Sequence, residues 1–186
     1  MKLLVKIGGT LVDNEASRRA IAHQLAQVAR RHQVVAVHGG GKQLTRFLHE
    51  RGVTSHFVHG LRVSDAPVID AVTKVIAGSV NKHLVSAMIH AGRPAIGISG
   101  IDGSLTRVVQ LDPKLGWVGK PVTSDGRLFD VLLAAGYTPV VACVAGDQDG
   151  NIYNVNADQM AASCASGWSA NKLIFLTDVD GVKDGN

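Results

Sequence analysis

Short apolar runs alternate with longer segments of helical periodicity along almost the whole chain. The apolar runs are rich in Val, Ile, Leu and Ala, as in strands buried on both faces, and they cover residues 3–7, 34–37, 95–98, 138–144 and 173–177. Between them, apolar residues recur every three or four positions and predict helices over about residues 15–31, 42–51, 65–89, 125–135 and 156–166. This alternation predicts an α/β fold, a three-layer αβα sandwich with a mainly parallel central sheet.

Three weaker patterns interrupt the alternation. Residues 55–63 predict a short hairpin around His59-Gly60, which would place Arg62 near the start of the next helix. Residues 106–110 and 117–119 suggest a small antiparallel excursion, and residues 151–155 a short strand after a turn. In a mainly parallel sheet, functional residues are expected at the carboxyl ends of the strands.

Composition narrows the class of protein. The chain has 186 residues, 46% hydrophobic and 18% charged, which is ordinary for a globular α/β domain. The formal charge of +4 is spread along the chain without a run of like charges, so we expect no nucleic acid partner. The most apolar stretch, residues 131–146, is broken by Gly136 and Pro139, so we expect no membrane span and a cytoplasmic protein.

Metal and disulfide chemistry are not indicated. The eight histidines have no metal-ligand spacing with cysteine or carboxylates, so no metal site is expected. The two cysteines, Cys143 and Cys164, lie in a strand and a helical pattern and are expected to be buried free thiols. His38 is expected to shape the loop that follows it.

Two strands end in glycine-rich loops. Residues 34–37 run into His38-Gly39-Gly40-Gly41-Lys42, and residues 3–7 run into Gly8-Gly9-Thr10. Glycines let the backbone approach a ligand closely, and the N–H groups of a following helix attract anions. The spacing matches neither a P-loop nor the dinucleotide fingerprint. A single such loop is often only a tight turn, but two of them suggest one phosphate-handling cleft.

Four motifs in this order resemble the amino acid kinase family across the whole chain. They are Lys6-Ile7-Gly8-Gly9, His38-Gly39-Gly40-Gly41, Gly60-Leu61-Arg62-Val63-Ser64-Asp65 and Asn154-Val155-Asn156-Ala157-Asp158-Gln159. The last two most closely resemble the branch of the family that acts on N-acetyl-L-glutamate. The resemblance implies a carbamate kinase-like fold. It also implies transfer of the γ-phosphoryl group of ATP, which carries Mg²⁺, to the side-chain carboxylate, giving an acyl phosphate in arginine biosynthesis.

The resemblance also implies roles for individual residues. Lys6 would neutralise the transferring phosphoryl group, and Asp158 would orient Lys6 through an ion pair. Backbone N–H groups of Gly8, Gly9, Gly40 and Gly41 would bind phosphoryl and acceptor oxygens. Arg62 would bind the substrate α-carboxylate, and Asn154 would hold the same end of the substrate.

Each of these residues also has a structural alternative. A lysine that ends a strand is usually solvated, and Arg62 could be an ordinary surface residue. Asn154 and Asp158 could be turn or cap residues, the commonest use of Asn and Asp before a helix. We expect Asn156 to be the structural cap of the helix over about residues 156–166.

The last residues resemble the start of the family's nucleotide-binding half. Residues 1–170 would form the acceptor-binding and dimerisation lobe, and residues 171–186 would begin the nucleotide-binding lobe. The residues expected at the nucleotide are Asp178, Val179, Asp180, Gly181, Val182 and Lys183. The family's chains continue well beyond this point, so we expect a fragment or a truncated form, and catalysis by residues 1–186 alone is doubtful.

Two alternatives remain open from the sequence. The acceptor could be a glutamate or aminoadipate carried by a small acidic protein, or the chain could be a non-catalytic module that keeps only the acceptor pocket. For assembly we expect a homodimer formed through the helix over about residues 65–89. Arginine-inhibited family members carry an extra N-terminal helix, for which residues 1–5 leave no room, so insensitivity to arginine is expected.

Overall fold

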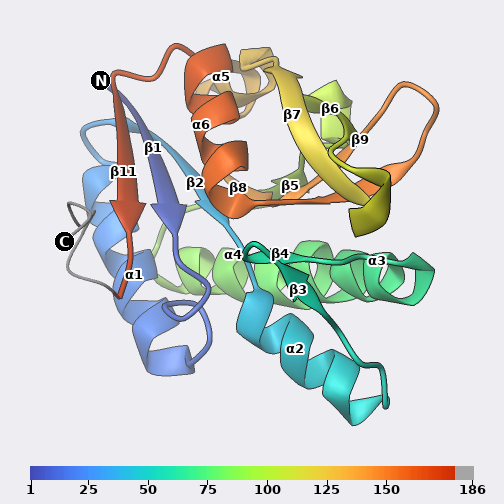
Figure 1. The fold of residues 1–186 in the computed structure, drawn as a ribbon. Helices are drawn as coiled ribbons and strands as arrows, with labels where there is room; N and C mark the ends of the chain where they lie inside the picture. Colours follow the sequence, from blue (N-terminus) through green and yellow to red (C-terminus); the bar gives the residue numbers. More distant parts are fainter. Residues whose placement is uncertain (179–186) are drawn as a thin grey trace, which may run out of the picture.

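Strand β1 (Lys2–Ile7) lies between β2 (Gln33–His38) and β11 (Lys172–Leu176), so the two ends of the described chain meet in one sheet (Figure 1). The computed structural model describes residues 1–178. Strands β8 (Thr138–Ala142) and β5 (Ala95–Ser99) complete the order β11-β1-β2-β8-β5. All neighbours in this sheet run parallel, which confirms the predicted mainly parallel core.

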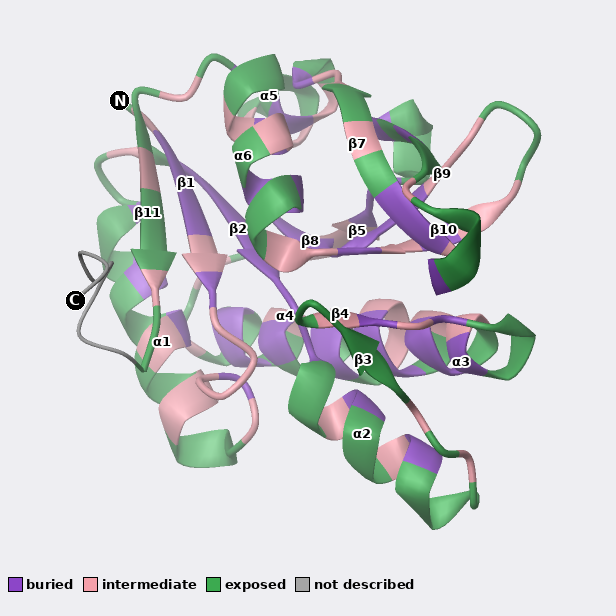
Figure 2. Ribbon diagram, in the orientation of Figure 1, coloured by how far each residue is buried: buried purple, intermediate pink, exposed green. Residues whose placement is uncertain are grey.

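Helices cover both faces of this sheet. Helices α1 (Glu15–Val28) and α4 (Asn81–His90) pack against each other below it, and α5 (Arg127–Ala134) and α6 (Ala157–Gly167) lie above it in the view of Figure 1. Figure 2 shows β2 and β8 buried along most of their length, whereas β11 is largely exposed. The Val-rich central runs are therefore buried on both faces, as their sequence predicts.

Local capping explains where several helices begin. Asn14 accepts a hydrogen bond from the N–H of Ser17, and Asp65 accepts one from the N–H of Val68. Asn156 accepts bonds from the N–H groups of Asp158 and Gln159, which confirms the expected cap. These side chains satisfy donors that the first turn of a helix leaves without partners.

The predicted helix over residues 65–89 is not α-helical throughout. It consists of α3 (Ala66–Val72), the π-helical segment η1 (Thr73–Val80) and α4. The apolar spacing does not distinguish a π-helical turn from an α-helical one, because both bury one face. π-Helical turns are uncommon and occur frequently at functional sites.

The predicted strand over residues 138–144 divides at Cys143. Its first part is β8 in the main sheet, and its second part, β9 (Val144–Gly146), joins a small closed barrel. The other barrel strands are β6 (Thr106–Gln110), β7 (Val118–Ser124) and β10 (Ile152–Val155). Strands β6 and β7 are antiparallel, so the expected excursion is confirmed, although its closure into a barrel was not predicted.

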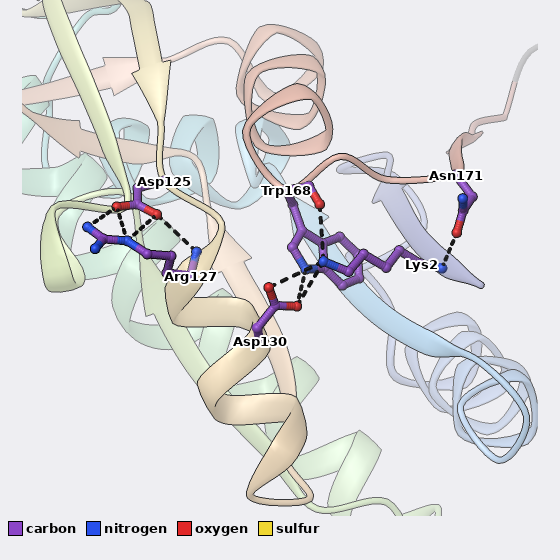
Figure 3. Close-up of polar contacts among 6 residues, drawn as sticks. All are labelled: Lys2, Asp125, Arg127, Asp130, Trp168 and Asn171. Carbon is purple, nitrogen blue, oxygen red and sulfur yellow. Dashed lines mark hydrogen bonds and ion pairs between the residues drawn. The ribbon is translucent and has the colours of Figure 1, made fainter.

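A polar cluster joins elements at the amino end of β1 (Figure 3). The Lys2 ammonium lies 3.0 Å from the Asp130 carboxylate and 5.1 Å from the centre of the Trp168 ring. The Trp168 indole donates to Asp130 at 2.9 Å, and the Lys2 N–H donates to Asn171 at 2.7 Å. The cluster therefore ties β1 to α5 and to the segment between α6 and β11.

Two predicted boundaries need adjustment. Helix α1 ends at Val28 rather than near residue 31, and α5 begins at Arg127 rather than near residue 125.

Both cysteines are buried free thiols, as expected. Among the described residues, no helix has both the length and the apolar character needed to cross a membrane.

Candidate functional site

The carboxyl ends of β1 and β2 lie side by side, since the two strands are parallel neighbours paired from Lys2 with Gln33 to Ile7 with His38. Each strand runs directly into its glycine loop. A cleft of about 460 Å³ opens there, and its lining includes Gly9, Gly40, Gly41, Arg62 and Asn154. The tertiary structure thus brings together both loops and two of the predicted substrate-binding side chains.

The two glycine loops approach each other closely. A Cβ atom on Gly9 would lie 3.5 Å from the backbone nitrogen of Gly41. On its other side, Gly40 packs against η1, where a Cβ atom would lie 3.3 Å from both Ile76 and Val80. Side chains at these positions would crowd the space between the loops, so glycine keeps backbone donors at the surface of the cleft.

Helix α2 (Gly41–Glu50) begins at the cleft. Its N-cap residue is Gly40, which makes no side-chain cap, and its first turn contains no acidic residue. The first N–H groups of a helix have no partner within the helix and carry partial positive charge. The start of α2 is therefore suited to bind an anion.

Gly8 differs from the expectation for it. Its backbone N–H donates to the carbonyl oxygen of Leu176 at 2.9 Å, so it extends the pairing of β1 with β11. This N–H, which was expected to bind phosphoryl oxygens, is thus engaged in the sheet in this structure. Gly9, which lines the cleft, is the remaining residue of the first loop for that role.

Lys6 and Asp158 form the expected ion pair. Lys6 Nζ lies 2.8 Å from Asp158 Oδ1, and the side chains are 15% and 57% exposed. Asp158 lies in the first turn of α6, where the Asn156 cap fixes the backbone. A largely buried lysine side chain, two residues before the first glycine loop, is therefore paired with a carboxylate from another element.

Cys143 lies on the wall of the same cleft, at the break between β8 and β9. Burial raises the pKa of its thiol to about 12. A thiol with so high a pKa carries almost no thiolate at neutral pH and is a poor nucleophile. Cys143 therefore contributes a neutral surface to the cleft.

Arg62 is placed by the hairpin of β3 (Phe57–Val58) and β4 (Leu61–Arg62). The turn residues His59 and Gly60 both have positive φ angles, 47° and 77°, as this tight turn requires. The predicted hairpin is thus confirmed. Arg62, however, faces α2 rather than the start of α3, and it is only 6% exposed.

The contacts of the Arg62 guanidinium are all with neutral groups. It donates to Ser55 Oγ, to Thr45 Oγ1 at 2.7 Å and to the Gly41 carbonyl at 3.2 Å, and it stacks on the ring of Phe57. Burial lowers its pKa. Among residues 1–178, no carboxylate forms an ion pair with it. A buried cation without a counter-ion favours an anionic ligand.

Asn154 is linked to Arg62 through Ser64. The Asn154 amide donates to Ser64 Oγ at 3.2 Å, and Ser64 Oγ donates to the Arg62 carbonyl at 3.0 Å. The sequence patterns assigned no supporting role to Ser64, Ser55 or Thr45. Only Thr45 had a usable signal, because it follows Gly41 by one helical turn on α2.

The nucleotide residues expected near the end of the chain are only partly described. Asp178 is exposed just after β11, at the same edge of the sheet as the glycine loops. Val179, Asp180, Gly181, Val182 and Lys183 lie outside the described residues.

Taken together, the lining of the cleft offers two kinds of partner for negative charge, the Arg62 guanidinium with the Asn154 amide and the backbone of the glycine loops. The Lys6–Asp158 ion pair adds an ammonium group on β1, two residues before Gly8. This arrangement is suited to hold a small molecule with two anionic groups, and to place one of them beside a phosphoryl group.

The chain is similar to known proteins over almost its whole length. The model of the amino acid kinase family matches residues 1–186. An acetylglutamate kinase of Solibacter usitatus is 58% identical over 99% of this chain and 72% of its own length. An acetylglutamate kinase of Endomicrobium trichonymphae is 42% identical over 98% of this chain and 73% of its own. The crystal structure of smu.665 from Streptococcus mutans UA159 covers 98% of this chain and 75% of its own, with a TM-score of 0.86 at 25% identity.

Proposed function

Because the chain belongs to the amino acid kinase family, we propose that it phosphorylates the side-chain carboxylate of N-acetyl-L-glutamate, a step of arginine biosynthesis. The observation that carries the proposal is the pair of anion sites in one cleft. N-acetyl-L-glutamate has two carboxylates and no free amine, so it carries charge that both sites can bind.

The acceptor is held at its α-carboxylate end by Arg62 and Asn154. Hydrogen bonds to Thr45, Ser55 and Gly41 already fix the Arg62 side chain, so it loses little conformational entropy when the ligand binds. The side-chain carboxylate then lies at the start of α2, where the N–H groups of Gly40 and Gly41 donate hydrogen bonds to its oxygens. The carboxylate is ionised at neutral pH and needs no general base to attack phosphorus.

The phosphoryl group is held by Lys6 and Gly9. The reaction brings two anions together, so the protein must offset their repulsion and align them more than it must supply a nucleophile. The carboxylate oxygen forms a bond to the γ-phosphorus while the bond to the β-phosphate oxygen breaks, giving an acyl phosphate and ADP. Lys6 stabilises the charge that spreads over the transferred oxygens, and Asp158 keeps Lys6 in place.

The described residues fit the phosphate end of ATP. Two glycine loops without side chains leave space for phosphoryl oxygens beside a cation. Mg²⁺, carried by the nucleotide, would supply further neutralisation of phosphate charge when bound. Asp178 and residues 179–183 remain the proposed nucleotide contacts. Strand β11 pairs with β1, so the proposed division into lobes near residue 170 crosses a continuous sheet.

We propose a homodimer in the cytoplasm as the assembled form. Support comes from Ile89 on α4, an apolar side chain that is 56% exposed on the long helix α3–η1–α4. Light scattering on the purified protein tests the dimer, and a monomer would exclude it.

The function is tested by measuring acyl phosphate formation from ATP and N-acetyl-L-glutamate, trapped as the hydroxamate, with the full-length protein. Free L-glutamate and a carrier-bound glutamate are the comparison acceptors. We expect turnover with N-acetyl-L-glutamate only. Turnover only with the carrier-bound acceptor would support the alternative kinase. Binding of N-acetyl-L-glutamate without turnover would support a non-catalytic module.

A further inference from the structure

His38 is a fully buried histidine at the end of β2, immediately before the second glycine loop. Its Nδ1 atom lies 2.8 Å from the carbonyl oxygen of Gly39. A carbonyl oxygen can only accept a hydrogen bond, so Nδ1 must carry the hydrogen. The ring is therefore a donor to the backbone of the loop.

The other ring nitrogen is held by Asn81. His38 Nε2 lies 3.0 Å from Asn81 Nδ2, which also donates to the Val140 carbonyl at 2.9 Å. Because the amide nitrogen only donates, Nε2 must accept, and the ring is neutral. Burial agrees with this state, since it lowers the pKa of His38 to about 4. Asn81 thus selects the tautomer that places a hydrogen on Nδ1.

The position of Asn81 is itself fixed. Its Oδ1 accepts from Lys82 Nζ at 3.3 Å, and Lys82 also donates to the Gly97 carbonyl at 3.2 Å. A Cβ atom on Gly97 would lie 1.8 Å from Asn81 Oδ1, so the lack of a side chain at Gly97 on β5 leaves room for the Asn81 amide. Asn81 directly follows η1, the π-helical segment on which Gly40 packs.

The hydrogen bond to Gly39 has a consequence for the next residue. In a planar trans peptide, the carbonyl of Gly39 and the N–H of Gly40 point in opposite directions. With the carbonyl turned toward the buried His38 ring, the N–H of Gly40 points away from it. The Gly40 nitrogen lies 3.7 Å from the Cβ position of Gly9, so it is next to the first glycine loop across the cleft.

We propose that His38 and Asn81 are positioning residues that fix the Gly39–Gly40 peptide with its N–H directed to the cleft before any ligand binds. Neither residue touches the substrate in this role. The proposal has two parts. The ordered loop is a property of the protein without ligand, whereas the effect on ligand affinity rests on the proposed acceptor function.

Two substitutions of His38 distinguish the roles of its ring nitrogens Nδ1 and Nε2. In His38→Asn the amide nitrogen can take the place of Nδ1 and keep a donor for Gly39. In His38→Gln the amide group reaches the place of Nε2, where its oxygen can accept from Asn81, and the donor for Gly39 is lost. Thr138→Val is the matched control. It removes a buried hydroxyl that accepts from Arg93 at 2.8 Å, at the opposite end of β8 from the cleft.

Nuclear magnetic resonance on the protein without ligand gives the first readout. We expect the wild-type His38 ring to carry its hydrogen on Nδ1, and the amides of Gly39 to Gly41 to be as ordered as β2. His38→Gln should lower the order of these amides, while His38→Asn and Thr138→Val should not. Hydrogen on Nε2, or equal loop order in His38→Gln and His38→Asn, would overturn the proposal.

Calorimetry with N-acetyl-L-glutamate gives the second readout. We expect His38→Gln to raise the Kd about tenfold and His38→Asn no more than about threefold, the scale of one hydrogen bond. Thr138→Val should leave the Kd unchanged even where it lowers the melting temperature. Equal Kd values for the two His38 variants would contradict the positioning role. If the wild-type protein binds no N-acetyl-L-glutamate, the proposed function fails, and loop order alone decides the role of His38.

Discussion

Lys6 on β1 and Asp158 on α6 form an ion pair above the carboxyl end of the sheet, with 2.8 Å between Nζ and Oδ1. The Lys6 side chain is largely buried, whereas the Asp158 side chain is more than half exposed. Lys6 is thus the more enclosed member, and it is held beside the glycine loops where phosphoryl oxygens would lie. This asymmetry suggests that Asp158 acts through Lys6, and the first two predictions test this order of roles.

Lys6→Ala should lower the kcat of the full-length protein about 100-fold or more while changing the KM for N-acetyl-L-glutamate little. The charge is needed mainly as phosphoryl oxygens separate in the transition state, and loss of such a contact usually costs several kcal/mol. Steady-state kinetics with both substrates varied measures the effect. Lys2→Ala is the control, since Lys2 lies on the same strand at its other end. An unchanged kcat would contradict the role of Lys6.

Asp158→Asn should lower kcat less than Lys6→Ala, because the ammonium remains but loses its partner. In the double variant, the Asp158 substitution should add almost nothing to the loss already caused by Lys6→Ala. Residues that act through one another give such non-additive effects, and a double-mutant cycle in kcat measures them. Fully additive losses would show that Asp158 has a separate role.

Arg62→Lys should raise the KM for N-acetyl-L-glutamate, about tenfold or more, with kcat nearly unchanged. A lysine cannot reproduce the planar fork that joins Ser55, Thr45 and Gly41, and a remote carboxylate is bound similarly in the ground and transition states. Arg46→Lys, an exposed arginine paired with Asp13, is the matched control and should leave KM unchanged. A loss confined to kcat would contradict this assignment.

Asp130→Asn should reduce stability at neutral pH without changing KM. The hydrogen bond from the Trp168 indole, with a smaller effect of the Lys2 ammonium, holds the pKa of Asp130 below its ordinary value. A carboxyl with a lowered folded-state pKa stabilises the protein above its unfolded pKa, and this contribution is lost as the pH falls through the folded pKa.

Because Asp130 is half exposed and solvent screens its contacts, the stability difference between wild type and Asp130→Asn should be about 0.5 kcal/mol at pH 7 and shrink below about pH 4. Urea unfolding at several pH values measures it. Asp112→Asn, at a carboxylate that only caps a short turn through the N–H of Lys114, is the comparison. A difference that grew on acidification would contradict the contribution of the Asp130 carboxylate.

The sequence predicted most of the α/β framework because its signals are local. The runs that become β1, β2 and β5 are mostly apolar, and the cap at Asn156 depends only on residues within one turn. The two glycine loops follow their strands directly, so parallel pairing was enough to predict one cleft. The roles of Lys6 and Arg62 came from the family resemblance, not from these patterns.

The tertiary structure decided which distant groups share an environment. The sequence left open whether Arg62 is a ligand-binding or an ordinary surface residue, and only its packing against α2 makes it a buried cation without an acidic partner among residues 1–178. The sequence indicates no partner for the N–H of Gly8, but the pairing of β11 with β1 brings the Leu176 carbonyl into hydrogen-bond distance of it. The His38–Asn81 hydrogen bond joins β2 to the residue after the π-helical segment η1. Neither the apolar pattern of the strand nor the helical spacing predicts this contact.

The division at Cys143 shows the same limit in the fold itself. An apolar run predicts a buried strand, but its hydrophobicity does not determine which other strand it pairs with. Residues 138–142 pair within the main sheet, whereas residues 144–146 pair within the barrel. Strand pairing depends on hydrogen bonds to segments far away in the chain. The sequence therefore determined where strands, loops and caps form, and the packed structure determined their partners.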